Sequence, residues 1–347
     1  MGTLHSQYVY GNATAGAGCC LVQFQGEMLL IFPGGGGAGG AAPNYQINLM
    51  PVNPFQGNQD YSAQGLVVLG DKTSERPAAV VFNNKLFIAY TDTTPVRQVQ
   101  LLAFTDRHSA PQRIPLNETA VGGPALAVFQ DHTTNQPPTL LLSFCGGGGF
   151  GGAAPNGQIN IMRSLDGFQW SDAAPGKTVL RQTSFHSPAL FSYLDNTDAR
   201  VMLAFTGTNS QVYLVNCEGL NFAGSNGHGG MNSQPGTPFF QVTNETSELG
   251  PSFATCNYGG PATIDWSQAL LWTGTGNRLL NTLFGSQNSL TVTAKTTFQQ
   301  TAQFEPALLH VPPGADDSPA PLDEWIVAWV GTNSIHSLNV ALLNLNA

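Results

Sequence analysis

The chain has 347 residues, a length that fits either two or three domains or one large all-β unit. Charged residues make up only 10% of it, against a usual share of about 25%, so long amphipathic helices with charged outer faces are not expected. The net charge of -9 disfavours nucleic acid and anionic membrane surfaces as partners, because both attract clustered cations.

The N-terminus and the cysteines give no sign of secretion, disulfide bonds or metal binding. The N-terminus lacks the basic and apolar segments of a signal peptide, and no apolar run is long enough to span a membrane. We therefore expect a soluble protein, cytoplasmic or released without a visible signal peptide. The five cysteines contain no Cys-x-x-Cys pair, which favours buried reduced thiols over a disulfide framework or a zinc site.

One unit recurs along the chain. It opens with a short apolar strand, often after Pro-Ala, as in Gly123-Pro-Ala-Leu-Ala-Val-Phe and Ser187-Pro-Ala-Leu-Phe-Ser-Tyr. A second strand ends at an aromatic residue in every unit: Phe32, Tyr90, Phe144, Phe205, Trp272 and Trp329. A third strand alternates with period two, as in Gln158-Ile-Asn-Ile-Met, and a weaker fourth strand follows, as in Thr178-Val-Leu-Arg. The repeated aromatic residues are predicted to pack between units, because each unit buries its faces only against its neighbours.

The units start near residues 18, 76, 123, 187, 250 and 305, at spacings that suit four-stranded propeller blades. The last unit ends after its third strand, whereas the N-terminal stretch from Ser6 resembles the fourth strand of the other units. The sequence therefore predicts one domain over residues 1–347: an all-β, six-bladed β-propeller of four-stranded antiparallel blades. The N-terminal strand joins the C-terminal blade, so that residues 1–17 complete it and close the ring. A β-sandwich or a parallel β-helix fits these long repeats less well.

The units resemble repetitive propellers of the sialidase superfamily. The matching motifs are Phe205-Thr-Gly-Thr-Asn, Trp272-Thr-Gly-Thr-Gly-Asn and Trp329-Val-Gly-Thr-Asn, with Leu338-Asn-Val after the last. Ser164-Leu-Asp-Gly-Phe-Gln-Trp170 resembles the Asp-box turn of that superfamily, one residue short, and the stretch from Asn216 to Phe222 resembles a degenerate copy. The resemblance implies that Asp166 and Glu218 bind their own backbone instead of doing chemistry. Many members of that superfamily are lectins or have no known activity, so the resemblance implies the fold far more strongly than any function.

The loops between second and third strands should lie on one face, together with the links between blades. This face carries two near-identical Gly-rich insertions, 33–44 and 145–156, which lack the Lys and the strand-to-helix setting of a phosphate loop. They are either flexible surface loops or a backbone-lined pocket for hydroxylated ligands. The candidate ligand-binding residues on this face are Gly34, Gly37, Asn44, Thr91, Asp92, Gly146, Gly149, Asn156, Thr208, Asn209, Thr275, Asn277, Thr332 and Asn333.

Catalysis has weaker support than binding. Among the arginines only Arg76 and Arg278 are expected near the loop face, with Asp92 and Glu305 as carboxylates, which is too few for a sialidase or for a two-carboxylate glycosidase. No catalytic residue, metal or cofactor is expected. Three Asn-x-Thr motifs, at Asn12, Asn117 and Asn244, share one place in the repeat, and we interpret them as turns after the fourth strand.

Three functional hypotheses follow. The first is a non-enzymatic carbohydrate-binding propeller that recognises glycans or glycoconjugates through its Gly, Thr and Asn loops. The second is a structural or interaction subunit of a larger assembly or toxin, which docks a protein partner or self-assembles through the Gly-rich loops. The third is a divergent glycosidase.

Overall fold

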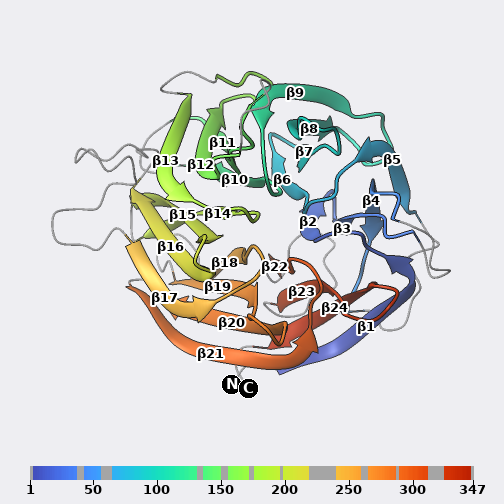
Figure 1. The fold of residues 1–347 in the computed structure, drawn as a ribbon, viewed down its shortest axis with the longest axis vertical. Helices are drawn as coiled ribbons and strands as arrows, with labels where there is room; N and C mark the ends of the chain where they lie inside the picture. Colours follow the sequence, from blue (N-terminus) through green and yellow to red (C-terminus); the bar gives the residue numbers. More distant parts are fainter. Residues whose placement is uncertain are drawn as a thin grey trace.

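The computed structural model describes residues 3–36, 43–55, 65–130, 136–149, 155–171, 176–195, 198–218, 240–258, 265–286, 289–311 and 324–344. These residues form six four-stranded antiparallel sheets arranged as blades around a central axis (Figure 1). The predicted six-bladed, all-β propeller is therefore confirmed. No stretch of the chain that the structure describes forms a helix of the length and apolar character needed to cross a membrane.

The first three blades follow one another along the chain. Blade 1 contains β2 (Cys20–Phe24), β3 (Glu27–Pro33), β4 (Gln46–Pro51) and β5 (Val67–Lys72). Blade 2 contains β6 (Ala78–Phe82), β7 (Lys85–Thr91), β8 (Gln98–Phe104) and β9 (Gln112–Thr119). Blade 3 contains β10 (Ala125–Phe129), β11 (Thr139–Cys145), β12 (Gln158–Ser164) and β13 (Lys177–Thr183).

The last three blades complete the ring. Blade 4 contains β14 (Ala189–Asp195), β15 (Asp198–Thr206), β16 (Gln211–Glu218) and β17 (Phe240–Thr246). Blade 5 contains β18 (Ser252–Tyr258), β19 (Asp265–Thr273), β20 (Leu279–Ser286) and β21 (Ser289–Thr301). Blade 6 contains β22 (Ala307–Val311), β23 (Glu324–Val330), β24 (Ser337–Asn344) and β1 (Thr3–Thr14).

The two ends of the chain meet in blade 6. Strand β1 pairs antiparallel with β24, from Thr3 opposite Asn344 to Thr14 opposite Ser337. The N-terminal strand therefore closes the ring as predicted, and it removes the free strand edge that β24 would otherwise present. In each blade the first strand lies innermost, and the fourth lies at the rim (Figure 1).

The aromatic residue near the end of each second strand is buried in a separate apolar cluster between two blades. Phe32, for example, packs with Ile326 and Val340 of the preceding blade, and Trp329 packs with Leu271 of the blade before it. The other four lie in the same way in their clusters. This confirms the predicted role in packing, and it explains why the chain keeps a large ring at one place in every repeat.

Each fourth strand carries a bulge opposite the start of the third strand. In blade 2, for instance, Thr119 pairs with Gln98 but Pro115 pairs with Gln100, so the outer strand has two extra residues. Corresponding register shifts occur in the other five blades. The Asn-x-Thr motifs at Asn12, Asn117 and Asn244 lie in these bulges, inside β1, β9 and β17. Their interpretation as turns after the strand is wrong, because the bulge lets the strand continue through the polar residues.

Candidate functional site

The loop face is built from two sets of segments, the loops between second and third strands and the links between blades. Antiparallel bridges join Ala15 to Gly34, Ala120 to Gly146, Ser247 to Gly274 and Ala302 to Gly331. Each bridge ties the link that enters a blade to a loop of that blade. At each of these four bridges, backbone hydrogen bonds thus hold the link and the loop together.

Six of the candidate binding residues have the same structural role. A side-chain oxygen Oδ1 accepts a hydrogen bond from the backbone N–H of the first residue of the third strand, over 2.9 to 3.2 Å. The six residues are Asn44, Asp92, Asn156, Asn209, Asn277 and Asn333. Such side-chain turns set the direction in which the chain enters the strand. Their recurrence in all six blades explains why Asn and Asp mark this position in the sequence.

The glycines beside these residues are required by close contact. A Cβ atom on Gly34 would lie 2.4 Å from Oδ1 of Asn44, and one on Gly146 would lie 2.5 Å from Oδ1 of Asn156. Gly149 has a φ of 79° and donates its N–H to Oγ1 of Thr119. Both Gly-rich loops are therefore anchored at their described ends, while Gly37 lies outside the described residues.

The candidate threonines differ in exposure. Thr91 is fully buried, and its Oγ1 donates to the carbonyl oxygen of Gly122 over 2.7 Å. Thr208, Thr275 and Thr332 are exposed at the tips of their loops. The candidate residues thus lie around the whole ring, and neither of the two cavities described below is lined by them. Their role as ligand contacts stays a prediction.

Arg97 belongs to the loop face together with Arg76 and Arg278, so the expectation that no third arginine lies there is wrong. Arg97 and Arg278 occupy the same position, directly before the third strand, with φ values of 54° and 55°. Their positive φ turns the side chains back over the links between blades. Glu75 and Glu248 also lie there, as partners that the sequence did not single out.

These two arginines bind the links of their own blades. Arg97 Nη2 lies 2.6 Å from Oε1 of Glu75, and its guanidinium also donates to the carbonyls of Ala120 and Val121. Arg278 donates to the carbonyl of Gln303, and its Nε lies 3.8 Å from Oε2 of Glu248. Because each arginine is occupied in its own blade, the two do not converge as a clamp for a substrate carboxylate.

Six residues, one from each blade, surround the mouth of the central channel on this face. They stand two positions before the innermost strands: Gly18, Arg76, Gly123, Ser187, Gly250 and Glu305. Ser187 Oγ accepts from the N–H of Gly123 and donates to Oε1 of Glu305 over 3.3 Å. We call these six residues the inner ring.

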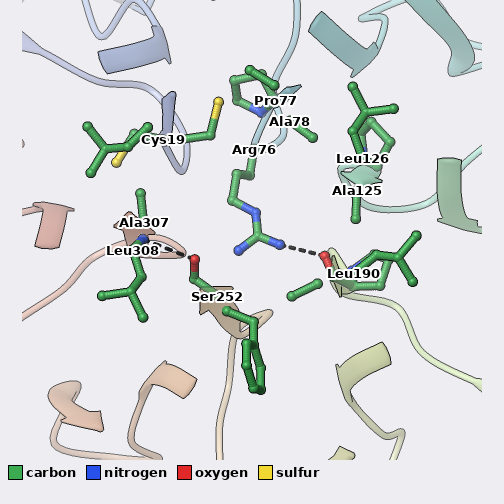
Figure 2. Close-up of a pocket in the computed structure, with 17 residues that line it drawn as sticks. Cys19, Arg76, Pro77, Ala78, Ala125, Leu126, Leu190, Ser252, Ala307 and Leu308 are labelled. Atoms are coloured by element: carbon green, nitrogen blue, oxygen red, sulfur yellow. Dashed lines mark hydrogen bonds between the residues drawn. The ribbon is translucent and has the colours of Figure 1, made fainter. Parts of the chain in front are cut away.

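Arg76 crosses the channel at the inner ring. Its guanidinium donates to the carbonyl oxygens of Pro188 and Pro251, over 2.6 and 2.7 Å, which belong to the links into blades 4 and 5. Figure 2 shows the Arg76 side chain reaching into the space between the innermost strands. The side chain is buried, so burial lowers the pKa of Arg76, while the negative charge of Glu305 opposes that shift. Arg76 of blade 2 thus connects its own blade to the links into blades 4 and 5 across the central channel.

A cavity of about 100 Å³, partly open to solvent, lies around Arg76 and is lined by the starts of all six innermost strands (Figure 2). Most of the residues that line it are Ala, Leu and Pro. Cys19 and Cys20 belong to this lining, and burial raises the pKa of the Cys19 thiol to about 12. Cys19 and Cys145 are buried and unpaired, as predicted for structural thiols. The side chains of Cys217 and Cys256 lie outside the described part.

A second cavity of about 120 Å³ lies at the rim, between blades 2 and 3. One wall is the bulge of β9 from Ile114 to Glu118, and the other contains Met162, Phe168 and Trp170. We call this cavity the rim groove. The sequence did not indicate this cavity, because its two walls belong to different blades and come together only when the blades pack.

The turn that carries Trp170 is held by its own hydrogen bonds. Asp166 Oδ1 accepts from the N–H groups of Phe168 and Gln169 and from the hydroxyl of Ser164. The indole Nε1 of Trp170 donates to the carbonyl of Gly167, whose φ is 80°. The predicted structural role of Asp166 is therefore confirmed, while the side chain of Glu218 is outside the described part.

Within the part of the chain that the structure describes, no three His, Cys, Asp or Glu side chains are grouped so as to hold a metal ion.

The comparisons with known proteins agree on the fold. No family model matches the chain, and no curated protein sequence matches it. Its structure is similar to AofleA from Arthrobotrys oligospora, with a TM-score of 0.54 and 7% identity over 98% of this chain and 86% of that one. It is also similar to the six-bladed lectin of Aleuria aurantia, with a TM-score of 0.54 and 10% identity over 96% and 92% of the two chains.

A third similar structure is the SapL1 lectin in complex with α-methyl fucoside, with a TM-score of 0.53 and 8% identity over 94% of this chain and 95% of that one. At such low identity these likenesses establish the six-bladed fold. The resemblance of the repeats to the sialidase superfamily stays a prediction.

Proposed function

We propose that this chain is a carbohydrate-binding propeller, a lectin without catalytic activity. The observation that carries the proposal is the likeness over nearly the whole chain to two lectins, the six-bladed, fucose-recognising lectin of Aleuria aurantia and SapL1, which was solved with α-methyl fucoside. Because one fold can host both binding and chemistry, the chain's own residues must also fit this function.

The loop face supplies neutral polar groups for a sugar. Thr208, Asn209, Thr275, Asn277 and Thr332 are exposed in three consecutive blades, and they combine hydroxyl and amide groups that donate and accept hydrogen bonds. A repeated arrangement around a ring would engage several sugars of one glycan surface and would raise the apparent affinity.

The charged groups of the same face favour binding over hydrolysis. Glu75 pairs with Arg97, Glu248 lies near Arg278, and Glu305 accepts from Ser187 inside the ring. Asp92 accepts from the backbone of its own turn. A glycosidase needs two carboxylates free to face one bond, and these four are spread over separate structural contacts.

The test is a screen of the full chain on an array of neutral, fucosylated and acidic glycans. We expect binding to a defined subset, and silence on every glycan would overturn the proposal. We expect no hydrolysis of chromogenic glycosides at several pH values. Hydrolysis of any of them would favour a glycosidase over a lectin. Size-exclusion chromatography with light scattering tests the alternative of a self-assembling subunit, for which a ring or filament would be the signature.

A further inference from the structure

The rim groove combines an aromatic wall with a polar one. Phe168 meets the buried Phe87 edge to face at 5.7 Å, and Lys85 Nζ lies 4.7 Å from the centre of its ring. Trp170 is half-buried beside it, with its indole N–H already bonded to Gly167. The aromatic wall is therefore rigid before any ligand arrives, which lowers the entropic cost of binding.

The opposite wall carries hydrogen-bonding groups that are not all in use. The side chain of Asn117 is exposed and makes no hydrogen bond among the residues that the structure describes. Glu118 pairs through Oε1 with Nζ of Lys177 from β13. That ion pair fixes the carboxylate at the groove and leaves Oε2 as an acceptor.

We propose that the rim groove binds one pyranose residue of a neutral glycan, an inference that rests on the proposed lectin function. The face of Trp170 stacks against the C–H groups of the sugar, because an aromatic face carries partial negative charge. The Asn117 amide and the Glu118 carboxylate bind neighbouring hydroxyls on the other side. An apolar surface with a few placed polar groups is the usual composition of a small-molecule site.

The junction between blades 4 and 5 offers a natural control within the same molecule. Its bulge repeats the sequence of β9, with Asn244-Glu245-Thr246 in place of Asn117-Glu118-Thr119. Lys295 Nζ lies 2.6 Å from Oε2 of Glu245, which matches the Lys177 pair. Only two residues, 287 and 288, separate β20 from β21, so this junction lacks a turn like the one that carries Trp170. The bulge alone is therefore not expected to bind a sugar.

The experiment titrates the full chain with methyl glycosides of fucose, galactose, mannose and glucose, followed by ¹H–¹⁵N spectra. We expect the Trp170 indole and Asn117 amide signals to shift with one of them. Asn117→Ala and Trp170→Ala should each weaken this binding about tenfold or more, as expected for central contacts. Asn244→Ala is the matched control and should leave it unchanged.

The two proposals fail differently. If the chain binds glycans but its affinity and the signals are unaffected by Asn117→Ala and Trp170→Ala, the groove is not a sugar site, and the lectin function stands. If the wild-type chain binds no glycan at all, both proposals fall. Asn117→Ala removes a side chain without structural bonds, so it separates binding from folding even if Trp170→Ala is unstable.

Discussion

The inner ring and the outer rim both join neighbouring blades, but they do so with different chemistry. At the inner ring the contacts are buried and the backbones of neighbouring blades lie close together. Arg76 donates there to carbonyls of the links into blades 4 and 5. At the rim, ion pairs connect successive fourth strands: Asp71 with Arg113, Glu118 with Lys177 and Glu245 with Lys295. In each pair the acid stands in the bulge of one blade and the base in the next blade.

This difference shows where the fold tolerates change. Three of the six inner-ring positions are glycine, because a side chain there would collide with the neighbouring blade. The rim pairs stand partly in solvent, where an ion pair contributes about 1 kcal/mol or less. The rim can therefore vary between blades without loss of the ring, and the groove beside Trp170 lies at one of these rim junctions.

The largest effect is expected from Arg76→Met. The change leaves the buried Glu305 without its nearest positive charge and leaves the carbonyls of Pro188 and Pro251 without donors. Breaking a buried charge arrangement of this kind costs about 3 kcal/mol of unfolding free energy. Urea denaturation followed by tryptophan fluorescence measures it.

Adding Glu305→Gln to Arg76→Met tests whether the loss of stability comes from the unpaired charge of Glu305. Because it removes the charge that Arg76→Met strands, the double variant should recover part of the lost stability. A double variant less stable than Arg76→Met alone would mean that Arg76 acts only through its two carbonyl acceptors.

Gly123→Ala should have the next largest effect. A Cβ atom there would lie 2.1 Å from the carbonyl oxygen of Arg76, so the backbone of the inner ring must move, at a cost of about 2 kcal/mol. Gly70→Ala is the control at the rim, because a Cβ at Gly70 meets nothing within 4 Å. Thermal unfolding should separate the two variants clearly, and equal melting temperatures would erase the contrast between ring and rim.

The sequence predicted the ring better than the site. The aromatic residue near the end of each second strand recurs in every blade, and Pro-Ala opens four of the six, so the blade count could be read from local signals. The closure by β1 could be read from the last unit, which ends after its third strand, and from the likeness of the N-terminal stretch to a fourth strand. The recurrence of Asn44 and its five counterparts between the repeats suggested ligand contacts, although each accepts a hydrogen bond within its own turn. Asn117 and Trp170 line the same cavity only because two blades pack together, and their one sequence signal was the Asp-box-like turn in blade 3.

Lys295→Gln should have a smaller effect than either ring substitution. The side chains of Lys295 and Glu245 are 40% and 25% exposed, so water and salt screen their attraction. We expect a loss of about 0.5 kcal/mol in low salt, which should shrink further in about 1 M NaCl. The measurement is urea denaturation at both salt concentrations, and a loss as large as that of Arg76→Met would place the rim among the main supports of the ring.

The smallest effects are expected from pH, and they should have opposite signs in the two regions. At the rim, burial alone would raise the pKa of Asp71, but hydrogen bonds from Arg113 and Tyr90 lower it below its usual range, so its stabilisation is lost as the pH falls through that lowered pKa. Near the inner ring, burial raises the pKa of Glu75 despite its bond to Arg97, so ionised Glu75 weakens the fold at neutral pH and ceases to do so on acidification. Relative to the wild type, Asp71→Asn should therefore be least stable at neutral pH, and Glu75→Gln should be at its most favourable there. The Glu75→Gln difference should fade as the pH falls to about 4, close to the ordinary carboxyl pKa, whereas the Asp71→Asn difference should fade only below that pH. Denaturation curves of the two variants at several pH values should thus bend in opposite directions, and parallel curves would contradict the assigned shifts.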